Sequence, residues 1–209
     1  MAPGSLTPAG AARNGAVLQS MGQRLRDLRR RHGWTLEELS ERTGLAISTI
    51  SKAERGLVAL GYDRFIALAH GMGIDVGELF SPEGDAFEPG CVATSSAAQA
   101  TVHETDTYIY RMLFPTVRGK QMLPMIGQIK AHSIASFPSL ISHDGEEFVY
   151  VLSGVLDLFV DGRNPTRLAQ GECAYFDSSR GHAYVSAGEG DAQILVVCFG
   201  HKGEERPTA

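Results

Sequence analysis

Three side chains that can bind a divalent metal stand at two points in the second half of the chain. His143 and Glu147 flank a tight Asp144-Gly145 turn, so both side chains can return to one side of a strand pair. His182 follows a second turn. Two imidazoles and one carboxylate can occupy one face of a metal and leave its other positions open. The set predicts a metal site, with Fe, Zn, Ni and Mn as candidate ions. In the alternative reading Glu147 pins a turn, His182 bonds a strand, and no metal binds.

A second group of polar residues lies in the first third of the chain. Thr35 and Glu38 have the spacing of a capping box, in which each side chain bonds the other residue's backbone amide and so begins a helix. Gly44 suits the left-handed turn that ends that helix, and a second short helix is expected over 47–54. Two short helices joined by a glycine-containing turn predict a helix-turn-helix unit, whose second helix enters the major groove of DNA.

The predicted DNA contacts follow from this geometry. Ser48, Thr49 and Lys52 lie close together on one helix surface and can bond bases or phosphates. Ile47 touches a thymine methyl in one reading and simply packs in another. The full set of expected contacts is Thr35, Ile47, Ser48, Thr49, Lys52, Arg24 and Arg29. The competing interpretation is a helical bundle whose arginine-rich face is only solvated.

The elements that must position these residues divide the chain in two. Apolar residues recur at helical spacing over 18–80, whereas short β-prone runs separated by turn signals follow from 103 onward. The fold class expected is therefore α+β with two domains, an all-α bundle followed by an all-β barrel or sandwich. The boundaries we expect are a disordered tail at 1–17, a helix-turn-helix domain at 18–80, a linker at 81–102, a β domain at 103–201 and a tail at 202–209.

Charge and cysteine content restrict the function further. The net charge of −5 argues against a protein that coats nucleic acid, yet residues 1–64 carry +4 and residues 65–209 carry −9. No apolar run approaches the ~20 residues that span a bilayer, and no secretory signal is evident. Three widely spaced cysteines favour neither a zinc knuckle nor a disulfide framework; Cys173 and Cys198 are expected in the core. The expected location is the cytoplasm, with no membrane partner.

The run Ser48-Thr-Ile-Ser-Lys-Ala-Glu-Arg-Gly56, with the helix before it, resembles the Xre/Cro-like repressor family. The resemblance implies that residues 47–54 form a recognition helix that reads an operator in double-stranded DNA. The chain departs from the family pattern at Leu36, Ile47 and Ala46, where Gln, a polar residue and a capping Ser are common. Loss of that cap is expected to weaken the helix by about 1 kcal/mol.

The runs 143–154 and 171–182 resemble the two motifs of the cupin family, which implies a jelly-roll barrel whose mouth holds a metal, a ligand or both. The family has a further His where this chain has Ile141, so one metal ligand of the pattern is missing. Tyr184 is expected on the same side of its strand as His182. The residues expected to line a ligand pocket are Arg111, Gln128, Ile141 and Tyr184.

The whole chain therefore resembles a one-component transcriptional regulator, with an Xre/Cro-like head and a cupin that senses a small-molecule effector. A homodimer is expected, because one short helix reads few bases and two heads read a pseudo-palindrome. The reading is not enzymatic, but two alternatives remain open. One is a mononuclear non-haem iron oxygenase resembling hydroxypropylphosphonate epoxidase, which would use His143, Glu147 and His182. The other is a metal-free cupin used only for dimerisation.

Overall fold

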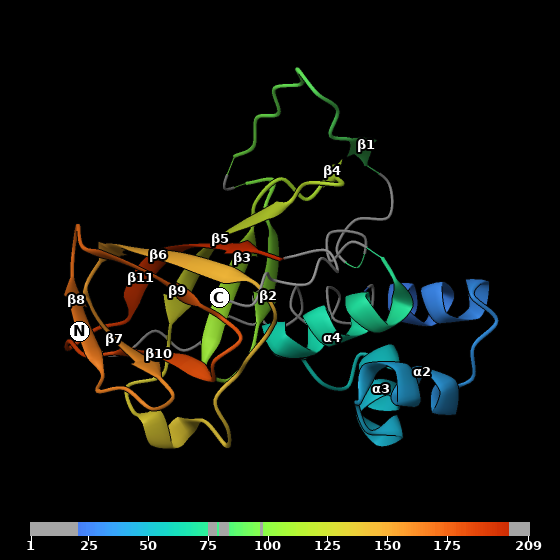
Figure 1. Ribbon diagram of the computed structural model, residues 1–209, viewed down its shortest axis with the longest axis horizontal. Helices are drawn as coiled ribbons and strands as arrows, with labels where there is room; N and C mark the ends of the chain where they lie inside the picture. Colours follow the sequence, from blue (N-terminus) through green and yellow to red (C-terminus); the bar gives the residue numbers. More distant parts are fainter. Residues whose placement is uncertain (1–20, 75–78, 80–83, 97, 201–209) are drawn as a thin grey trace, which may run out of the picture. The chain divides into compact units, whose positions relative to one another are not determined.

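The computed structural model of the protein describes residues 21–74, 79, 84–96 and 98–200. The chain divides into two compact units (Figure 1), which we call the head unit (Met1–Thr105 with Pro115–Gly119) and the barrel unit (Asp106–Phe114 with Lys120–Ala209). The tails predicted at 1–17 and 202–209, and residues 18–20, 75–78 and 80 of the predicted helix-turn-helix domain, lie outside the described residues. Within the described part of the chain, no helix combines the length and apolar character needed to cross a bilayer.

The head unit is helical, as the sequence predicts. Residues 21–31 form its first described helix. Three further helices follow, α2 (Leu36–Thr43), α3 (Ile47–Glu54) and α4 (Tyr62–Met72). The bounds of α3 agree with the second short helix expected over 47–54. The predicted two-domain α+β class is confirmed by this helical region and the β-rich region that follows it.

Local chemistry sets the ends of α2. The Thr35 hydroxyl accepts a hydrogen bond from the Glu38 amide, and the Glu38 carboxylate accepts one from the Thr35 amide, so the predicted capping box is present. Gly44 ends the helix in the left-handed conformation with φ of 68°, which residues with a Cβ adopt at a cost. Leu39 of α2 and Ile50 of α3 are fully buried, so they contribute to the packing of this helix pair.

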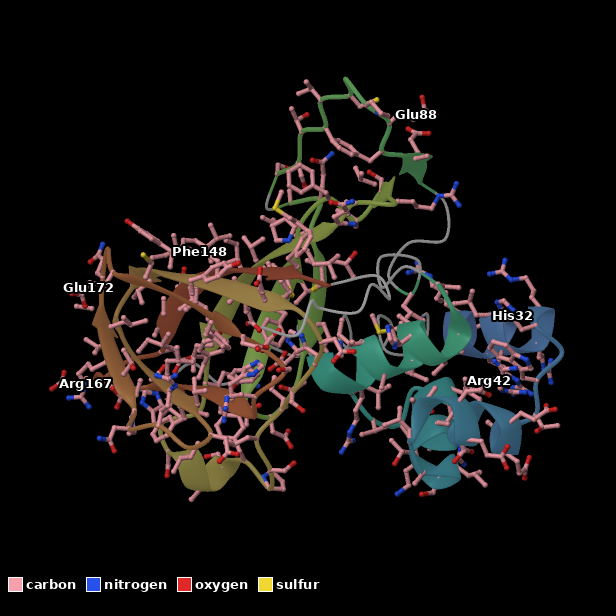
Figure 2. All side chains as sticks on the ribbon, viewed as in Figure 1. His32, Arg42, Glu88, Phe148, Arg167 and Glu172 are labelled. Carbon is pink, nitrogen blue, oxygen red and sulfur yellow. The ribbon has the colours of Figure 1, made fainter. Side chains whose placement is uncertain are left out.

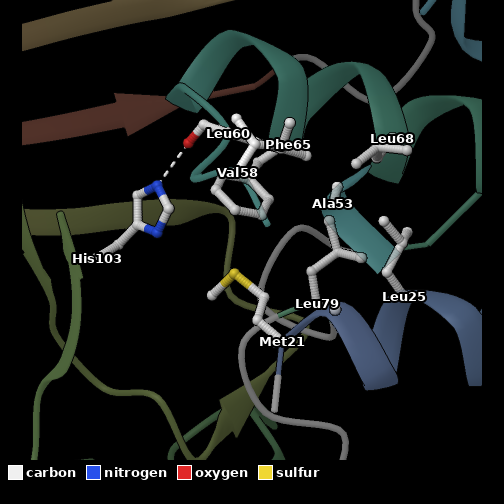
Figure 3. Close-up of a pocket in the computed structure, with 10 residues that line it drawn as sticks. Met21, Leu25, Ala53, Val58, Leu60, Phe65, Leu68, Leu79 and His103 are labelled. Atoms are coloured by element: carbon white, nitrogen blue, oxygen red, sulfur yellow. Dashed lines mark hydrogen bonds between the residues drawn. The ribbon is translucent and has the colours of Figure 1, made fainter. Parts of the chain in front are cut away.

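The core of the head unit is a set of apolar side chains from its helices and from one strand. Figure 3 shows His103 reaching this core and pointing one ring nitrogen at the backbone oxygen of Leu60. The residues around the central cavity are Met21, Gly22, Leu25, Ala53, Val58, Leu60, Phe65, Leu68, Leu79 and His103. The cavity volume is about 20 Å³, which is room for about one water. As far as the described residues show, this cavity is therefore too small for a metabolite.

The segment predicted as a linker contains regular structure. β1 (Asp85–Ala86) pairs in parallel with β4 (Val117–Arg118), and β2 (Thr101–Glu104) begins inside the expected linker. His103 was expected to open the β domain, but it packs edge-on against Phe65 of the head unit. The segment is rich in Pro, Gly, Ser and Ala, and this composition alone indicated a linker. The pairing of β1 with β4 and the packing of His103 on Phe65 involve residues distant in the sequence, so composition does not reveal them.

The barrel unit consists of two antiparallel sheets. Its strands are β3 (Tyr108–Met112), β5 (Met122–Ile129), β6 (Glu146–Ser153), β7 (Val155–Val160), β8 (Thr166–Ala169), β9 (Cys173–Asp177), β10 (His182–Ser186) and β11 (Ala192–Phe199), with a 3-10 turn at Ile134–Ser136. Within this unit the larger sheet has the order β3-β5-β11-β6-β9, and the smaller one has the order β10-β7-β8 (Figure 1). This arrangement places strands distant in sequence side by side.

The core of the barrel unit lies between the inward faces of the two sheets. Strict alternation along β6 and β11 buries every second side chain. Val149 and Val151 are fully buried, so they lie on the same inward face of β6 as Glu147. Gly145 precedes β6 with φ of 115°, and a Cβ there would lie 2.0 Å from the backbone oxygen of Phe199, so only glycine fits.

The cysteine predictions have mixed outcomes. Cys198 lies on the inward face of β11 and is buried, as expected. Cys173 was expected in the core but is exposed, so that prediction is wrong. The register pairs Cys173 with Tyr150, whose side chain also points away from the interior, so both belong to the outer face of the sheet. An apolar run identifies a strand, but the register decides which of its two faces is buried.

Candidate functional site

The α3 helix presents a polar surface on the side opposite its packing face. Ile50 and Ala53 are buried, whereas Ser48 and Lys52 are exposed and stand one turn apart on the helix. Ile47 is 41% exposed, and Thr49 is half-buried. The helix therefore offers hydroxyl, ammonium and apolar groups to an external partner, which is the combination that reads base edges and phosphates.

Arg29 has a different environment from the one predicted. Its guanidinium donates to both Glu54 carboxylate oxygens at 2.6 and 2.9 Å and to the Trp34 backbone oxygen at 2.7 Å. Only 11% of its side chain is exposed, and the hydrogen bond with Glu54 raises the pKa of Arg29. These contacts join the first described helix to α3. The geometry argues against the predicted phosphate contact, because the guanidinium is largely buried and each of its three nitrogens already donates within the head unit.

The remaining predicted DNA contacts of the head unit, Thr35 and Arg24, differ in exposure. Thr35 is exposed, but its hydroxyl caps α2. Arg24 is half-buried. Arg42, which was not among the predicted contacts, lies over the Trp34 ring at 4.2 Å and is exposed (Figure 2). A cation held over an aromatic face keeps its outer side available to an anion, so we add Arg42 to the candidate phosphate contacts.

In the barrel unit three of the predicted residues converge on one carboxylate. The Nε2 atoms of His143 and His182 lie 3.1 and 3.3 Å from Glu147 Oε2, and the Tyr184 hydroxyl donates to Glu147 Oε1 at 2.7 Å. All four side chains are buried, with His182 and Tyr184 at 0 and 1% exposure. The predicted grouping of His143, Glu147 and His182, and the inward direction of Tyr184, agree with this geometry.

Backbone contacts bring these side chains together from separate elements. Ile141 forms an isolated bridge with His182, with reciprocal bonds of 3.1 and 2.7 Å, and the His143 amide bonds the Ser178 oxygen. Glu147 opens the inward row of β6, and His182 begins β10 in the other sheet. The site is therefore assembled where the two sheets approach each other.

The ring orientations leave lone pairs directed at the carboxylate. His182 Nδ1 lies 3.0 Å from the Arg180 backbone oxygen, an acceptor that requires the proton on Nδ1. A neutral His182 then points its Nε2 lone pair at Glu147 Oε2, and His143 Nε2 faces the same oxygen. Two nitrogens and a carboxylate oxygen can stay this close only if a proton or a metal cation lies among them. The donor set thus fits a divalent metal.

The charge states of the site follow from its burial and its partners. Burial raises the pKa of Glu147, but in the metal-free site hydrogen bonds and attraction from protonated His143 and His182 outweigh this and lower it to about 2. Burial and the neighbouring Glu147 charge raise the pKa of Tyr184 well above its ordinary value. At neutral pH the site therefore contains an ionised carboxylate that accepts from a neutral phenol.

Sequence reasoning placed Cys198 in the core and gave it no role at the site. In the β11–β6 register Cys198 stands directly opposite Glu147. Among the described residues, a group of metal-ligating side chains with donor atoms within 4.8 Å of one another is formed by His143, Glu147 and Cys198. The alternation along β11 could have indicated an inward thiol, but only the pairing brings it beside the carboxylate.

The remaining predicted pocket residues do not join this cluster. Gln128 and Arg111 alternate with the buried residues of β5 and β3, so they lie on the outer face of the sheet. The Gln128 amide donates to Asp191 at 2.9 Å. Ile141 is half-buried beside His182 through their bridge. The register therefore argues against Arg111 and Gln128 as residues that line the interior.

Comparisons with known proteins assign each region to a known type of domain. A helix-turn-helix family model matches residues 25–79, and a cupin domain model matches residues 134–198. A search of curated proteins finds no match. The structure resembles an HTH_3 family transcriptional regulator from Vibrio cholerae, with 19% identity, a TM-score of 0.65, and coverage of 90% of this chain and 99% of that one. This similarity supports the shared fold.

A weaker likeness involves an enzyme. Hydroxypropylphosphonic acid epoxidase from S. wedmorenis aligns with 23% identity and a TM-score of 0.48, covering 87% of this chain and 98% of that one.

Proposed function

We propose that this chain, which combines a helix-turn-helix domain with a cupin domain, is a sequence-specific transcriptional regulator that senses a small molecule. The observation that carries the proposal is the polar surface of α3. Ser48 and Lys52 are exposed on the face opposite Ile50 and Ala53, at the position of a recognition helix. The match of residues 25–79 to a helix-turn-helix family model supports the role proposed for this surface.

We further propose that the chain acts as a homodimer that pairs through its barrel unit. One recognition helix contacts few base pairs, and two related heads read the two halves of a pseudo-palindromic operator. The outer face of the larger sheet exposes Tyr150, Leu152 and Tyr175, with Tyr175 66% exposed. Apolar side chains gathered on one sheet face favour a second copy of the chain there. Sedimentation of Tyr175→Glu against the wild type tests this contact.

The barrel interior is the proposed site of the effector. The cluster of His143, Glu147 and His182 offers nitrogen and oxygen donors that would hold a divalent metal, with Fe, Zn, Ni and Mn as the candidate ions. A bound metal would supply a Lewis-acid position for a donor atom of the effector. An effector that favours one conformation by ~1–3 kcal/mol would change operator affinity about 5- to 150-fold.

Selection of binding sites from genomic DNA with the purified protein tests the regulator proposal. We expect one enriched motif, and Lys52→Ala should weaken binding to it at least about 10-fold while lowering the slope against salt by about one. Arg163→Ala removes an exposed charge from a turn of the barrel unit and should leave affinity unchanged. The absence of any enriched motif would overturn the proposal.

A second candidate function is that of an iron-dependent oxygenase. The convergence of two imidazoles on one carboxylate favours it, because that ligand type suits non-haem iron. Protein loaded with Fe(II) under anaerobic conditions should then consume oxygen when candidate organic substrates are supplied. Stoichiometric iron binding without consumption would argue for a sensor.

A further inference from the structure

The barrel interior contains a sulfur ligand that the predicted metal site lacked. Cys198 lies on β11 opposite Glu147 on β6, and its exposed fraction is 2%. The Cys198 Sγ, a Glu147 carboxylate oxygen and a His143 ring nitrogen lie within 4.8 Å of one another. Zinc binds such atoms at about 2.0–2.3 Å, so two ligand atoms of a tetrahedral site lie roughly 3.3–3.8 Å apart. An inward movement of at most about 1.5 Å would therefore bring all three into coordination.

We propose that Cys198, His143 and Glu147 form a metal site for Zn²⁺, with the Cys198 thiolate as its soft ligand. The inference rests on the metal-binding role proposed above for the barrel, and it replaces His182 by Cys198 as the third ligand. A thiolate beside an imidazole favours zinc over the hard cations Mg²⁺ and Ca²⁺. One thiolate and one carboxylate also balance the two charges of the ion, which matters where water is excluded.

His182 has a supporting part in this site. Its Nε2 lies 3.3 Å from Glu147 Oε2, and its Nδ1 bonds the Arg180 backbone oxygen. It does not join the group of three whose donor atoms are mutually close. His182 and the Tyr184 hydroxyl thus orient the two oxygens of the carboxylate from the side of the other sheet. Three protein ligands leave a fourth tetrahedral position for a donor atom of a small molecule.

The test uses Co²⁺ as a spectroscopic probe in the full chain, stripped of metal and kept reduced. Tetrahedral Co²⁺ bound to a thiolate gives a near-ultraviolet charge-transfer band that nitrogen and oxygen ligands do not give. We expect one Co²⁺ per chain and this band in the wild type. The double variant Cys91→Ser/Cys173→Ser, in which Cys198 is the sole remaining thiol, should retain both.

The Cys198→Ser variant should lose the band and bind Zn²⁺ more than about 100-fold more weakly. Removing a metal ligand lowers metal affinity more than removing a residue that only hydrogen-bonds a ligand, which lowers it about 10- to 100-fold. The His182→Ala variant should keep the band. Bound Co²⁺ without the band in the wild type and the double variant would overturn the assignment of Cys198. Should Cys198→Ser fail to fold, the double variant still decides the question.

Two outcomes separate this inference from the proposed regulation. If no Co²⁺ binds but the protein selects a DNA motif, the metal site is wrong and the regulator stands. If Co²⁺ binds with the thiolate band but no DNA motif is enriched, the metal site stands and the regulator is wrong. Loss of the band in His182→Ala would overturn the assignment of three ligands.

Discussion

Glu54 in the head unit and Glu147 in the barrel unit are carboxylates largely removed from water, and each is held by nitrogen donors. Glu54 faces Arg29, whose guanidinium stays charged at every ordinary pH and fits both carboxylate oxygens. Glu147 faces two imidazoles, whose nitrogens can hold either a proton or a metal. The first pair is a closed structural link, whereas the second is a site whose occupant can change.

The two units also direct their chemistry in opposite ways. The head unit uses its buried polar pair for stability and leaves Ser48 and Lys52 outside, where a macromolecule can reach them. The barrel unit points its polar cluster inward, where the side chains are buried away from any macromolecular partner. In the proposed regulator, DNA reading and sensing would therefore use separate residues.

The largest expected loss of stability follows from breaking the barrel cluster of His143, Glu147, His182 and Tyr184. In metal-free protein, Glu147→Ala leaves two imidazoles and the Tyr184 hydroxyl without their common acceptor. We expect the free energy of unfolding to fall by about 3–5 kcal/mol, the cost of breaking a buried ion pair. Urea denaturation followed by circular dichroism measures it. Glu189→Ala, at an exposed turn, is the control, and a loss below about 1 kcal/mol would show that the cluster is not an ionic core.

Breaking the Arg29–Glu54 pair of the head unit should lower stability somewhat less. Arg29→Ala removes three charge-assisted hydrogen bonds and should lower the stability of the head unit by about 2–3 kcal/mol. Trp34 is the single tryptophan of the chain, so its fluorescence during urea unfolding reports on this unit. Arg30→Ala, at an exposed position nearby, should have little effect on stability. Weakened DNA binding with unchanged stability would instead restore Arg29 as a phosphate contact.

A smaller change should stabilise α3, the proposed recognition helix. Ala46 is the N-cap of α3 and makes no side-chain capping bond, although its backbone has the extended conformation that a cap requires. Ala46→Ser supplies an acceptor for a free amide and should stabilise the head unit by about 1 kcal/mol. The same Trp34 measurement checks it. Ala46→Val adds bulk but no acceptor, and a similar gain from it would rule out capping as the cause.

The smallest effect is a pH dependence of the head unit. Burial lowers the pKa of His103, so below about pH 6.5 the unfolded chain takes up a proton that the folded chain resists. Stability should therefore fall as the pH falls, by about 0.5–1 kcal/mol between pH 7 and pH 6. His103→Gln should flatten this dependence, and His70→Gln, at an exposed site, should not. If the stability of His103→Gln depended on pH as strongly as that of the wild type, other groups would cause the dependence.

Local features of the fold were predictable because their causes lie within a few residues. The Thr35–Glu38 box and the left-handed Gly44 turn are set by neighbours in the chain, so the sequence predicts α2 and α3 closely. The spacing around the Asp144-Gly145 turn likewise predicts His143 beside Glu147. Features that depend on distant pairing were missed, among them β1 and the packing of His103 in the head unit.

The sequence by itself determined the two kinds of domain and the residues able to bind DNA or a metal, because residue type and short spacing carry that information. Only the tertiary structure decided which of those residues meet. Arg29 finds Glu54 across 25 positions, and Cys198 finds Glu147 across two paired strands. The same pairing turns Arg111 and Gln128 outward. Strand register and helix packing make these choices, since they join residues that no local pattern relates.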